Sequence, residues 1–242
     1  MGRIGNIINR KGKQDAKRAK IFTKHARAIA VAAKDGGADP EYNAALKTAI
    51  DKAKADNMPN DNIDRAVAKG AGAGANENYE TIVYEGYGPG GVAVLVEVLT
   101  DNNNRAAANV RNIFGKSGGN LGATGSVAYM FNRKGVIEYD AEKVSEDEIM
   151  DAALEAGADD IVTEDGVVTV TTDPSAFEEV LEALNQKGYE SVSAEVSMVP
   201  DTYSAIDKDT AAKVQKLIDR LEEDDDVQNV YTNADFPEDF EG

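Results

Sequence analysis

A run of small residues at 70–76, Gly-Ala-Gly-Ala-Gly-Ala-Asn, divides this 242-residue chain into two parts with different patterns. Such a run offers no side chains for a core and is typical of a flexible linker. Apolar residues recur at helical spacing before it, whereas β-rich segments with strand periodicity follow it. We therefore expect residues 1–76 to form a helical module with its linker, joined to a larger part that mixes strands and helices.

The helical module is expected to contain three helices. The first spans residues 14–34, which include no Gly or Pro, and ends at Gly36-Gly37. Asp39-Pro40 resembles an N-cap followed by proline at the first helical position, and therefore predicts the start of the second helix. Residues 57–60 separate that helix from a third one, which ends at Gly70. The second helix is expected to present Tyr42, Leu46, Ala49, Ile50 and Ala53 on one face.

The pattern after the linker predicts two α+β domains, one inserted in the other. Strands are expected at 81–85, 92–99 and 126–131, with a glycine turn at 86–91 and a helix at 105–117. Residues 132–200 then follow the order β-α-β-β-α-β of a ferredoxin-like unit. A final helix around 211–221 and a strand at 227–231 lack a sheet of their own, so we expect them to complete the domain begun at residue 77.

Local signals place the elements of the ferredoxin-like unit. A strand at 136–139 leads to a helix opened by the capping box Ser145-Glu148. Strands at 160–163 and 167–171 are joined at Asp165-Gly166, a signal for a tight hairpin. Asp173-Pro174 is expected to start the second helix, and the last strand is expected at 191–199. The predicted fold class is therefore multidomain α+β: a three-helix bundle (1–76), a discontinuous α+β domain (77–131 with 201–242) and a ferredoxin-like domain (132–200).

The two parts of the chain carry opposite net charge. Residues 1–75 contain 15 Lys and Arg against 8 Asp and Glu, a net charge of +7, whereas residues 76–242 contain 11 against 36, a net charge of −25. Because the Debye length is about 8 Å at physiological salt, a basic surface several such lengths from the acidic part stays positive locally. The asymmetry indicates that the helical module contacts a polyanion.

One face of the first helix carries much of this positive charge. Six of its cations are separated by steps of 4, 3, 4, 3 and 7 residues, from Lys13 to Lys34, which places them on one side of a helix. A solvated helix face has the same pattern, but Asp15 is the only acid within residues 1–34. We therefore favour phosphate contact. The expected nucleic-acid-binding residues are Arg10, Lys11, Lys13, Lys17, Arg18, Lys20, Lys24, Arg27 and Lys34.

The sequence predicts contact with the nucleic-acid backbone rather than with base edges. The third helix offers few side chains that read bases, namely Asn60, Asn62 and Arg65. Phosphate contacts position a protein without specifying sequence. The expected partner is therefore a nucleic acid recognised through its backbone and shape.

Motifs for cofactors and catalysis fail on their context. Gly86–Gly91 matches G-x-G-x-x-G, but strands are expected on both sides, whereas a dinucleotide site needs a following helix. Gly115-Lys116-Ser117 lacks the first glycine of a P-loop, because Val110 stands there. His25 is the only histidine, and beside Phe22 and Ile29 it is expected either to pack or to flank the basic face. The run Glu222–Asp226 lacks the glycine of a calcium loop, so we expect a solvated acidic turn. No catalytic residue, metal or cofactor is expected.

The composition favours a cytoplasmic protein without a membrane partner. The chain has no cysteine, which excludes disulfides and thiol catalysis. No window approaches the roughly 18 apolar residues of a membrane span, and the N-terminus lacks an apolar stretch of signal-peptide length.

Three loops rich in Gly and Asn have two interpretations: tight turns, or backbone that approaches an RNA or protein partner closely. The candidate partner-contact residues in them are Gly86, Tyr87, Gly88, Gly90, Asn102, Asn104, Arg105, Gly118, Gly119 and Asn120.

Several stretches of the chain form a recognisable set: Gln14-Asp15-Ala16-Lys17-Arg18 with residues 21–24, and residues 49–54, 57–59 with 61–63, 84–93, 99–102, 118–122 and 125–128. Together they resemble the signature sequences of the YebC/PmpR family of bacterial gene-expression regulators. The resemblance covers most of residues 1–137. It departs at the start, where the family commonly opens with Gly-His-Ser-Lys-Trp and this chain has Met1-Gly2-Arg3-Ile4-Gly5, so any role of that His or Trp does not carry over.

The resemblance implies a three-domain cytoplasmic regulator without catalytic residues. The family is labelled transcriptional and DNA-binding, while mitochondrial relatives are translational activators and bacterial members are tied to the relief of stalled ribosomes. Two functions therefore stay open at this point. One is a DNA-binding transcriptional regulator, and the other is a translation factor that binds ribosomal RNA. In either case the acidic domains are expected to meet transcription or ribosomal proteins.

Overall fold

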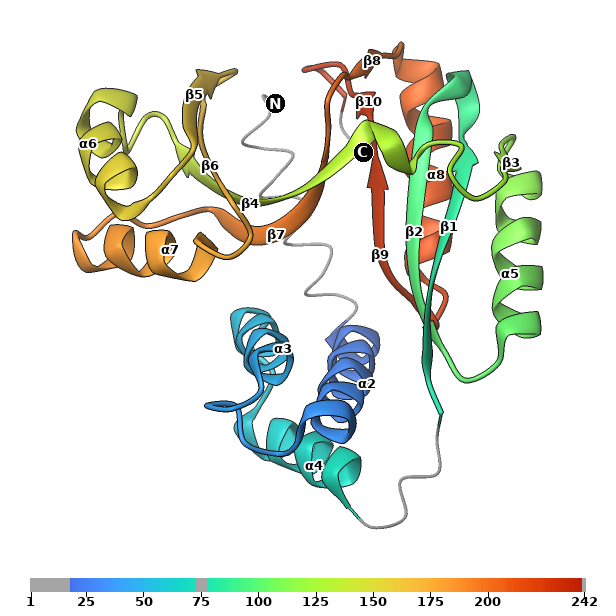
Figure 1. The fold of residues 1–242 in the computed structure, drawn as a ribbon. Helices are drawn as coiled ribbons and strands as arrows, with labels where there is room; N and C mark the ends of the chain where they lie inside the picture. Colours follow the sequence, from blue (N-terminus) through green and yellow to red (C-terminus); the bar gives the residue numbers. More distant parts are fainter. Residues whose placement is uncertain (1–17, 73–77, 241–242) are drawn as a thin grey trace.

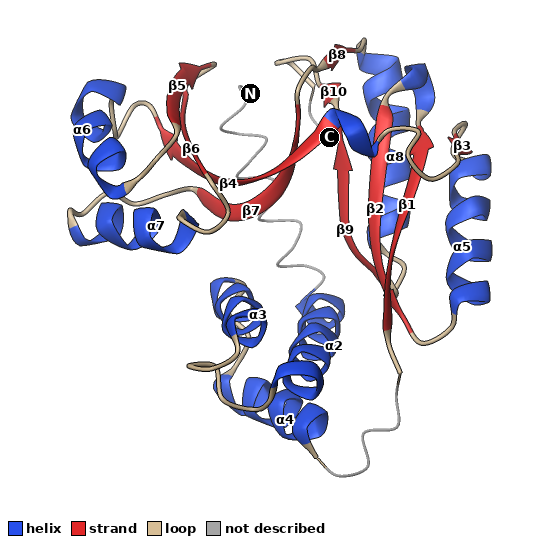
Figure 2. Ribbon diagram, viewed as in Figure 1, coloured by secondary structure: helices blue, strands red, loops and turns tan. Residues whose placement is uncertain are grey.

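The computed structural model describes residues 18–72 and 78–240. In this part of the chain, a helical bundle lies below two four-stranded sheets that carry their own helices (Figure 1). Figure 2 shows the division by secondary structure, with an all-helical unit on one side and strands confined to the rest. The predicted α+β fold class is confirmed.

Three helices form the bundle: α2 (Arg18–Gly36), α3 (Ala44–Ala55) and α4 (Asn60–Ala71). The buried residues of its core are Ile29, Ala33, Leu46, Ala53, Met58, Ile63 and Ala66. α4 approaches α2 closely, since a Cβ at Gly70 would lie 2.0 Å from the carbonyl oxygen of Ala30. Gly70 and Ala71 are therefore helical rather than part of the linker, and residues 73–77 lie outside the described residues.

The second helix begins later than Asp39-Pro40 predicted. Its N-cap is Asn43, whose side-chain oxygen accepts a hydrogen bond from the Leu46 N–H. The Asn43 amide also donates to the carbonyls of Ala32 and Gly37, 2.8 Å away, at the end of α2. One asparagine thus satisfies backbone groups of two helices, which favours the later start. Tyr42 lies outside the helix and is 86% exposed, so its predicted place on the helix face was wrong.

The first sheet joins segments that are distant in sequence. Its order is β3-β1-β2-β9, from strands β1 (Glu80–Tyr87), β2 (Ala93–Thr100), β3 (Asn120–Leu121) and β9 (Val227–Thr232). Two helices, α5 (Asn103–Lys116) and α8 (Lys208–Glu222), pack their apolar sides against the valines of one face of β2. The last helix and strand therefore complete the sheet begun after the linker, as predicted.

A single long strand, β4 (Phe131–Asp140), replaces the two short strands predicted at 126–131 and 136–139. Residues 126–130 instead form a turn and the 3-10 helix η2 (Ala128–Met130). β4 is continuous because it has a partner along nearly its whole length: it pairs with β7 (Ser193–Pro200) from Phe131 to Glu138.

The second sheet has the predicted ferredoxin-like order of elements. Between β4 and β7 lie α6 (Glu146–Ala156), β5 (Asp160–Glu164), β6 (Val167–Thr172) and α7 (Phe177–Gln186), and the strand order is β5-β6-β4-β7. The capping box of Ser145 and Glu148 is present. Asp165 and Gly166 have φ of 51° and 77°, as the tight hairpin requires.

The helix predicted to start at Asp173-Pro174 begins at Phe177 instead. The Asp173 carboxylate accepts a hydrogen bond from the Ser175 N–H at 2.8 Å and closes a turn before the helix. After β7, the chain returns to the first sheet through β8 (Ser204–Ala205), which pairs in parallel with β10 (Ala234–Asp235).

Candidate nucleic-acid interface

The predicted phosphate-binding residues fall into two groups. Arg10, Lys11, Lys13 and Lys17 lie outside the described residues, and Arg18 is the first residue of α2. Lys20, Lys24, Arg27 and Lys34 follow along α2, and each of these four side chains donates a hydrogen bond to another part of the described chain.

Three of these cations contact the turn between α8 and β9. Lys20 Nζ donates to the Glu223 carbonyl at 2.9 Å, and Lys24 Nζ donates to the Glu222 carbonyl at 2.6 Å. Arg27 Nη1 lies 3.1 Å from the Asp225 carbonyl. The last carbonyls of a helix lack intrahelical partners and carry the negative end of its dipole, so these cations cap α8.

Asp226 is the centre of this contact. Its side chain is 5% exposed and lies 2.8 Å from Arg27 Nη1 and 2.9 Å from Arg105 Nη2. A buried carboxylate is costly unless cations and hydrogen bonds compensate it, and the two arginines supply both. The expectation of a solvated turn at Glu222–Asp226 was therefore wrong for Asp226.

We call this set of contacts the clasp: Lys20, Lys24 and Arg27 on α2, residues 222–226 at the end of α8 and in the turn that follows, and Arg105 on α5. Burial lowers the pKa of the Lys24 ammonium, although the carboxylates of Glu222, Asp224 and Asp225 act in the opposite direction. The hydrogen bonds that Arg105 donates to Asp101 and then to Asp226 raise the pKa of its guanidinium above the usual range. Sequence periodicity could not find the clasp, because its two sides lie about 200 residues apart.

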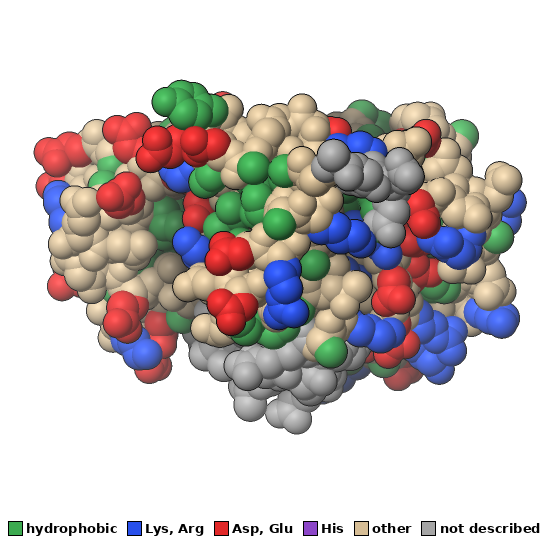
Figure 3. All heavy atoms as spheres, turned by 90° about the horizontal axis from the view of Figure 1, so that it is seen from below, with side chains coloured by type: hydrophobic (Ala, Val, Ile, Leu, Met, Phe, Trp, Pro, Cys, Tyr) green, Lys and Arg blue, Asp and Glu red, His purple; other side chains and the backbone are tan. Residues whose placement is uncertain are grey.

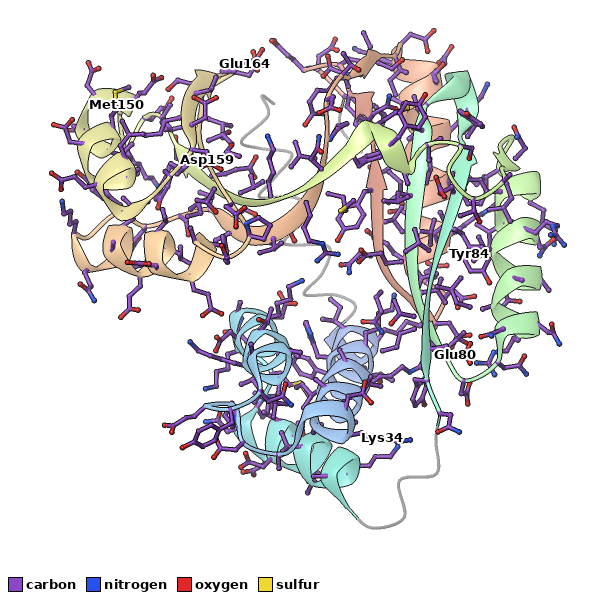
Figure 4. All side chains as sticks on the ribbon, in the orientation of Figure 1. Lys34, Glu80, Tyr84, Met150, Asp159 and Glu164 are labelled. Atoms are coloured by element: carbon purple, nitrogen blue, oxygen red, sulfur yellow. The ribbon has the colours of Figure 1, made fainter. Side chains whose placement is uncertain are left out.

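Further polar contacts hold the bundle beside the sheets. The Arg27 guanidinium lies 5.0 Å from the centre of the Tyr79 ring, and Lys34 Nζ donates to Asn78 Oδ1 at 3.0 Å. Figure 4 shows Lys34 pointing outward from the end of α2. On another side of the bundle, Lys47 of α3 pairs with Glu178 of α7 at 3.0 Å, and both side chains are half exposed.

His25 joins two helices of the bundle rather than simply flanking the basic face. Its Nε2 lies 2.6 Å from Asp56 Oδ2, in the residue that caps the C-terminus of α3. The contact orients α3 against α2 and offers no neighbouring nucleophile.

The predicted partner-contact loops are shaped largely by packing. Gly86 and Gly88 are buried, and a Cβ at Gly86 would lie 2.7 Å from the Asn120 carbonyl. A Cβ at Gly119 would lie 2.4 Å from the Tyr87 carbonyl, so the loops at 86–91 and 118–122 meet. Of their glycines, Gly90, Gly91 and Gly118 are exposed and have positive φ.

The third loop caps a helix. Asn102 is the N-cap of α5 and accepts from the Arg105 N–H, while Asn104 is exposed in the first turn. Arg105 belongs to the clasp. Nearby, Asn103 Nδ2 donates to Glu80 Oε2 at 2.6 Å, and Tyr84 packs against the core beneath α5 (Figure 4).

A buried carboxylate that the sequence did not reveal orders residues 125–128. Glu85 on β1 is 4% exposed and accepts hydrogen bonds from the N–H groups of Gly125, Val127 and Ala128 at 2.6–3.0 Å. Burial raises the pKa of the Glu85 carboxyl, but the three hydrogen bonds outweigh burial and hold the pKa below its usual value.

Within the described ranges, no group of three His, Cys, Asp or Glu side chains is placed to hold a metal ion. In the same part of the chain, no helix has the length and apolar character needed to cross a membrane.

The fold and this site define a class of protein: a basic helical bundle held by polar contacts against a two-sheet α+β body. Comparison with known families identifies the class. Residues 2–73 match the TACO1/YebC N-terminal domain, and residues 79–234 match the TACO1/YebC second and third domains. The chain belongs to the TACO1/YebC family.

Relatives cover nearly the whole chain. It is 69% identical to a probable transcriptional regulatory protein of Treponema denticola, over 97% of this chain and 95% of that one. It is 67% identical to a probable transcriptional regulatory protein of Clostridioides difficile, over 96% of this chain and 98% of that one. A crystal structure of the conserved hypothetical protein Aq1575 from Aquifex aeolicus superimposes with a TM-score of 0.80 at 48% identity, covering 93% of each chain.

Proposed function

We propose that this chain is a non-enzymatic regulator of gene expression that binds nucleic acid through its basic N-terminal segment and α2. The observation that carries the proposal is the separation of charge, with a net +7 on residues 1–75 beside −25 on the rest. The names of the relatives support a role in transcriptional regulation. Phosphate neutralisation by Lys and Arg is the main source of affinity in such proteins.

The clasp offers a model for how phosphate is held. The carbonyls of Glu222, Glu223 and Asp225 present oxygen acceptors at the negative end of a helix dipole. Phosphate oxygens have the same acceptor chemistry, so a nucleic acid can replace the turn as the partner of Lys20 and Lys24. Binding through α2 then exchanges one set of contacts for another and separates the bundle from α8.

The proposed partner is either DNA or RNA, contacted through the backbone. On α4, Arg65 Nε donates to the Asp61 carbonyl at 3.0 Å and Arg65 Nη2 donates to Asn62 Oδ1. Because these side chains engage each other, they are less available to read bases. This observation favours a second candidate function, a translation factor on structured ribosomal RNA, over recognition of a defined operator.

Crosslinking in cells followed by sequencing of the bound DNA and RNA separates the two candidates. Enrichment of promoter DNA supports the transcriptional role, while enrichment of ribosomal RNA and cosedimentation with ribosomes support the translational one. If the protein crosslinks to neither nucleic acid above background, the proposal is wrong.

Neutralising two cations of the clasp tests the binding residues. The slope of log affinity against log salt concentration reports how many phosphates are contacted, and each contact contributes roughly 0.7–0.9 to its magnitude. We therefore expect the double variant Lys20→Gln with Lys24→Gln to reduce the magnitude of this slope by about 1.4–1.8. The matched control is Lys143→Gln with Lys187→Gln, which removes the same charge from exposed positions near the second sheet. Equal slopes for the two variants, measured by fluorescence anisotropy, would contradict the assignment.

A further inference from the structure

The cations of the acidic part of the chain are concentrated on two helices. α5 and α8 together hold seven Lys and Arg against three Asp and Glu, and α5 has no acidic residue. The other residues of the range 78–240 hold four Lys and Arg against 31 Asp and Glu. Viewed from below, blue and red side chains are mixed on the side where α5 and α8 are placed, while red ones dominate over the second sheet (Figure 3).

The two helices form one continuous outer layer. Both pack on the same face of the first sheet, in the cluster that contains Val110 of α5 and Val214 of α8. Arg220 of α8 reaches across to the end of α5, where its Nη1 lies 3.1 Å from Ser117 Oγ and 3.4 Å from the Lys116 carbonyl. Their outward sides therefore adjoin. We define the α5–α8 face as Arg111, Lys116, Lys213, Lys216 and Arg220.

Opposite charge beside this face is sparse: the pKa of the Asp207 carboxyl is lowered first by hydrogen bonds from Thr210 and then by the charge of Lys213. Arg111, Lys116, Lys213 and Lys216 are exposed and form no ion pair with another residue of the described ranges. Asp219 of α8 accepts a hydrogen bond from Gln215 at 2.9 Å.

The spacing brings like charges together toward the end of α8, although Asp209 lies four residues before Lys213 and offsets part of the repulsion. Lys213, Lys216 and Arg220 follow at steps of three and four residues, so like charges lie side by side on the helix. Such pairs destabilise a helix by a few tenths of a kcal/mol each. Solubility does not require them, because the chain has a net charge of −18 already.

We infer that the α5–α8 face is a second contact surface for the phosphate backbone of a nucleic acid, in addition to α2. This inference rests on the proposed function. The charge of the face selects a polyanion, and its mixture of lysines and arginines on helix surfaces suits backbone phosphates. Unlike Lys20, Lys24 and Arg27, these cations are accessible while the clasp is closed, so the face contacts the nucleic acid before the bundle separates from α8.

The test uses the full chain and two labelled probes, a hairpin RNA and a duplex DNA of matched length and sequence. Binding is measured by anisotropy across a salt series for Arg111→Gln with Lys213→Gln and Lys216→Gln. The matched control is Lys134→Gln with Lys143→Gln and Lys187→Gln, which removes three charges from the second sheet and its loops. Thermal melts verify that both triple variants stay folded.

For the α5–α8 variant, we expect the slope of log affinity against log salt concentration to fall in magnitude by up to about 2–3, since three phosphate contacts contribute roughly 0.7–0.9 each. The control variant is expected to keep the wild-type slope. Loss on the RNA, the DNA or both identifies the nucleic acid. If the two variants weaken equally, the effect is one of net charge and the inference is wrong. If only the α2 variant loses binding, the inference fails while the proposed function stands. If the wild-type chain binds neither probe, both fail.

Discussion

Glu85 shows how one side chain can determine the path of a loop. Its carboxylate accepts three backbone N–H groups from residues 125–128 in a site that is almost closed to water. Without this acceptor, the buried N–H of Val127 would be unpaired, which costs roughly 1–3 kcal/mol, and the part-buried bonds of Gly125 and Ala128 would be lost as well. Glu85 therefore accounts for the turn and 3-10 helix that stand where the sequence predicted a strand at 126–131.

The Glu85→Gln variant is predicted to lose stability in a pH-dependent way. Because the folded-state pKa of Glu85 lies below its unfolded value of about 4.5, its contribution is fully present above that value and is lost as pH falls through the folded pKa. We expect the variant to be about 1–3 kcal/mol less stable at neutral pH. The difference in free energy of unfolding between wild type and Glu85→Gln should become smaller as the pH is lowered, as measured by denaturant unfolding.

The control for this prediction is Glu190→Gln, which removes a carboxylate at an exposed position. The prediction would be contradicted if the difference in free energy of unfolding between wild type and Glu85→Gln stayed constant from neutral to acidic pH. The carboxylate charge would then not be what holds the loop.

At the scale of elements, local signals predicted those parts of the fold that depend on local chemistry. The capping box at Ser145 and the hairpin at Asp165-Gly166 were confirmed because each is satisfied by residues within a few positions. The start of α3 was not, since Asn43 is selected by contacts with the end of α2 as well as by its own helix. Long-range acceptors such as Glu85, and the clasp at Asp226, leave no periodic signal in the sequence.

The candidate site was predicted in part for the same reason. Helical spacing correctly placed Lys20, Lys24 and Arg27 on one side of α2, away from the core of the bundle. It could not show that the end of α8 lies against them, because that contact depends on how the bundle packs on the first sheet. Their role in phosphate binding stays a prediction, as do the domain boundaries at 76, 131 and 200.

Replacing either of two helical glycines by alanine is predicted to change the stability of the chain, in opposite directions at the two positions. At Gly70, the new Cβ would meet the Ala30 carbonyl oxygen at 2.0 Å, and overpacking of this kind costs about 1–3 kcal/mol. At Gly115 near the end of α5, nothing lies within 4 Å of the new Cβ, so the helix propensity of alanine should stabilise the chain by up to about 1 kcal/mol. Thermal melts of Gly70→Ala and Gly115→Ala measure both effects. A stabilised Gly70→Ala would contradict the close approach of α4 to α2.

At the scale of the whole molecule, charges rather than apolar contacts attach the bundle to the sheets. The apolar cluster of the bundle contains only residues between Phe22 and Val67, and the other three clusters contain none of these. The contacts across the boundary include those of the clasp, the hydrogen bond that Arg27 donates to the Leu99 carbonyl, and the contacts Lys34–Asn78, Arg27–Tyr79 and Lys47–Glu178. The exposed pair Lys47–Glu178 is worth only about 0–1 kcal/mol, so the clasp dominates.

Salt and nucleic acid are therefore both predicted to break the clasp and move the bundle away from the first sheet. Since the chain has no cysteine, Ala68→Cys on α4 and Ala108→Cys on α5 can carry a dye pair that reports the distance between the bundle and the first sheet. We expect energy transfer to fall as salt rises toward 1 M, where the Debye length is about 3 Å, and to fall at low salt when RNA or DNA is added.

The variant Asp226→Asn should shift this fall in energy transfer to lower salt, because it removes the carboxylate that joins Arg27 to Arg105. A dye pair at Ala108→Cys and Ala212→Cys, both within the α5–α8 layer, should report no change. Energy transfer that stayed constant through the salt series while the protein bound nucleic acid would mean that binding leaves the clasp closed, and that Lys20 and Lys24 contact α8 rather than phosphate.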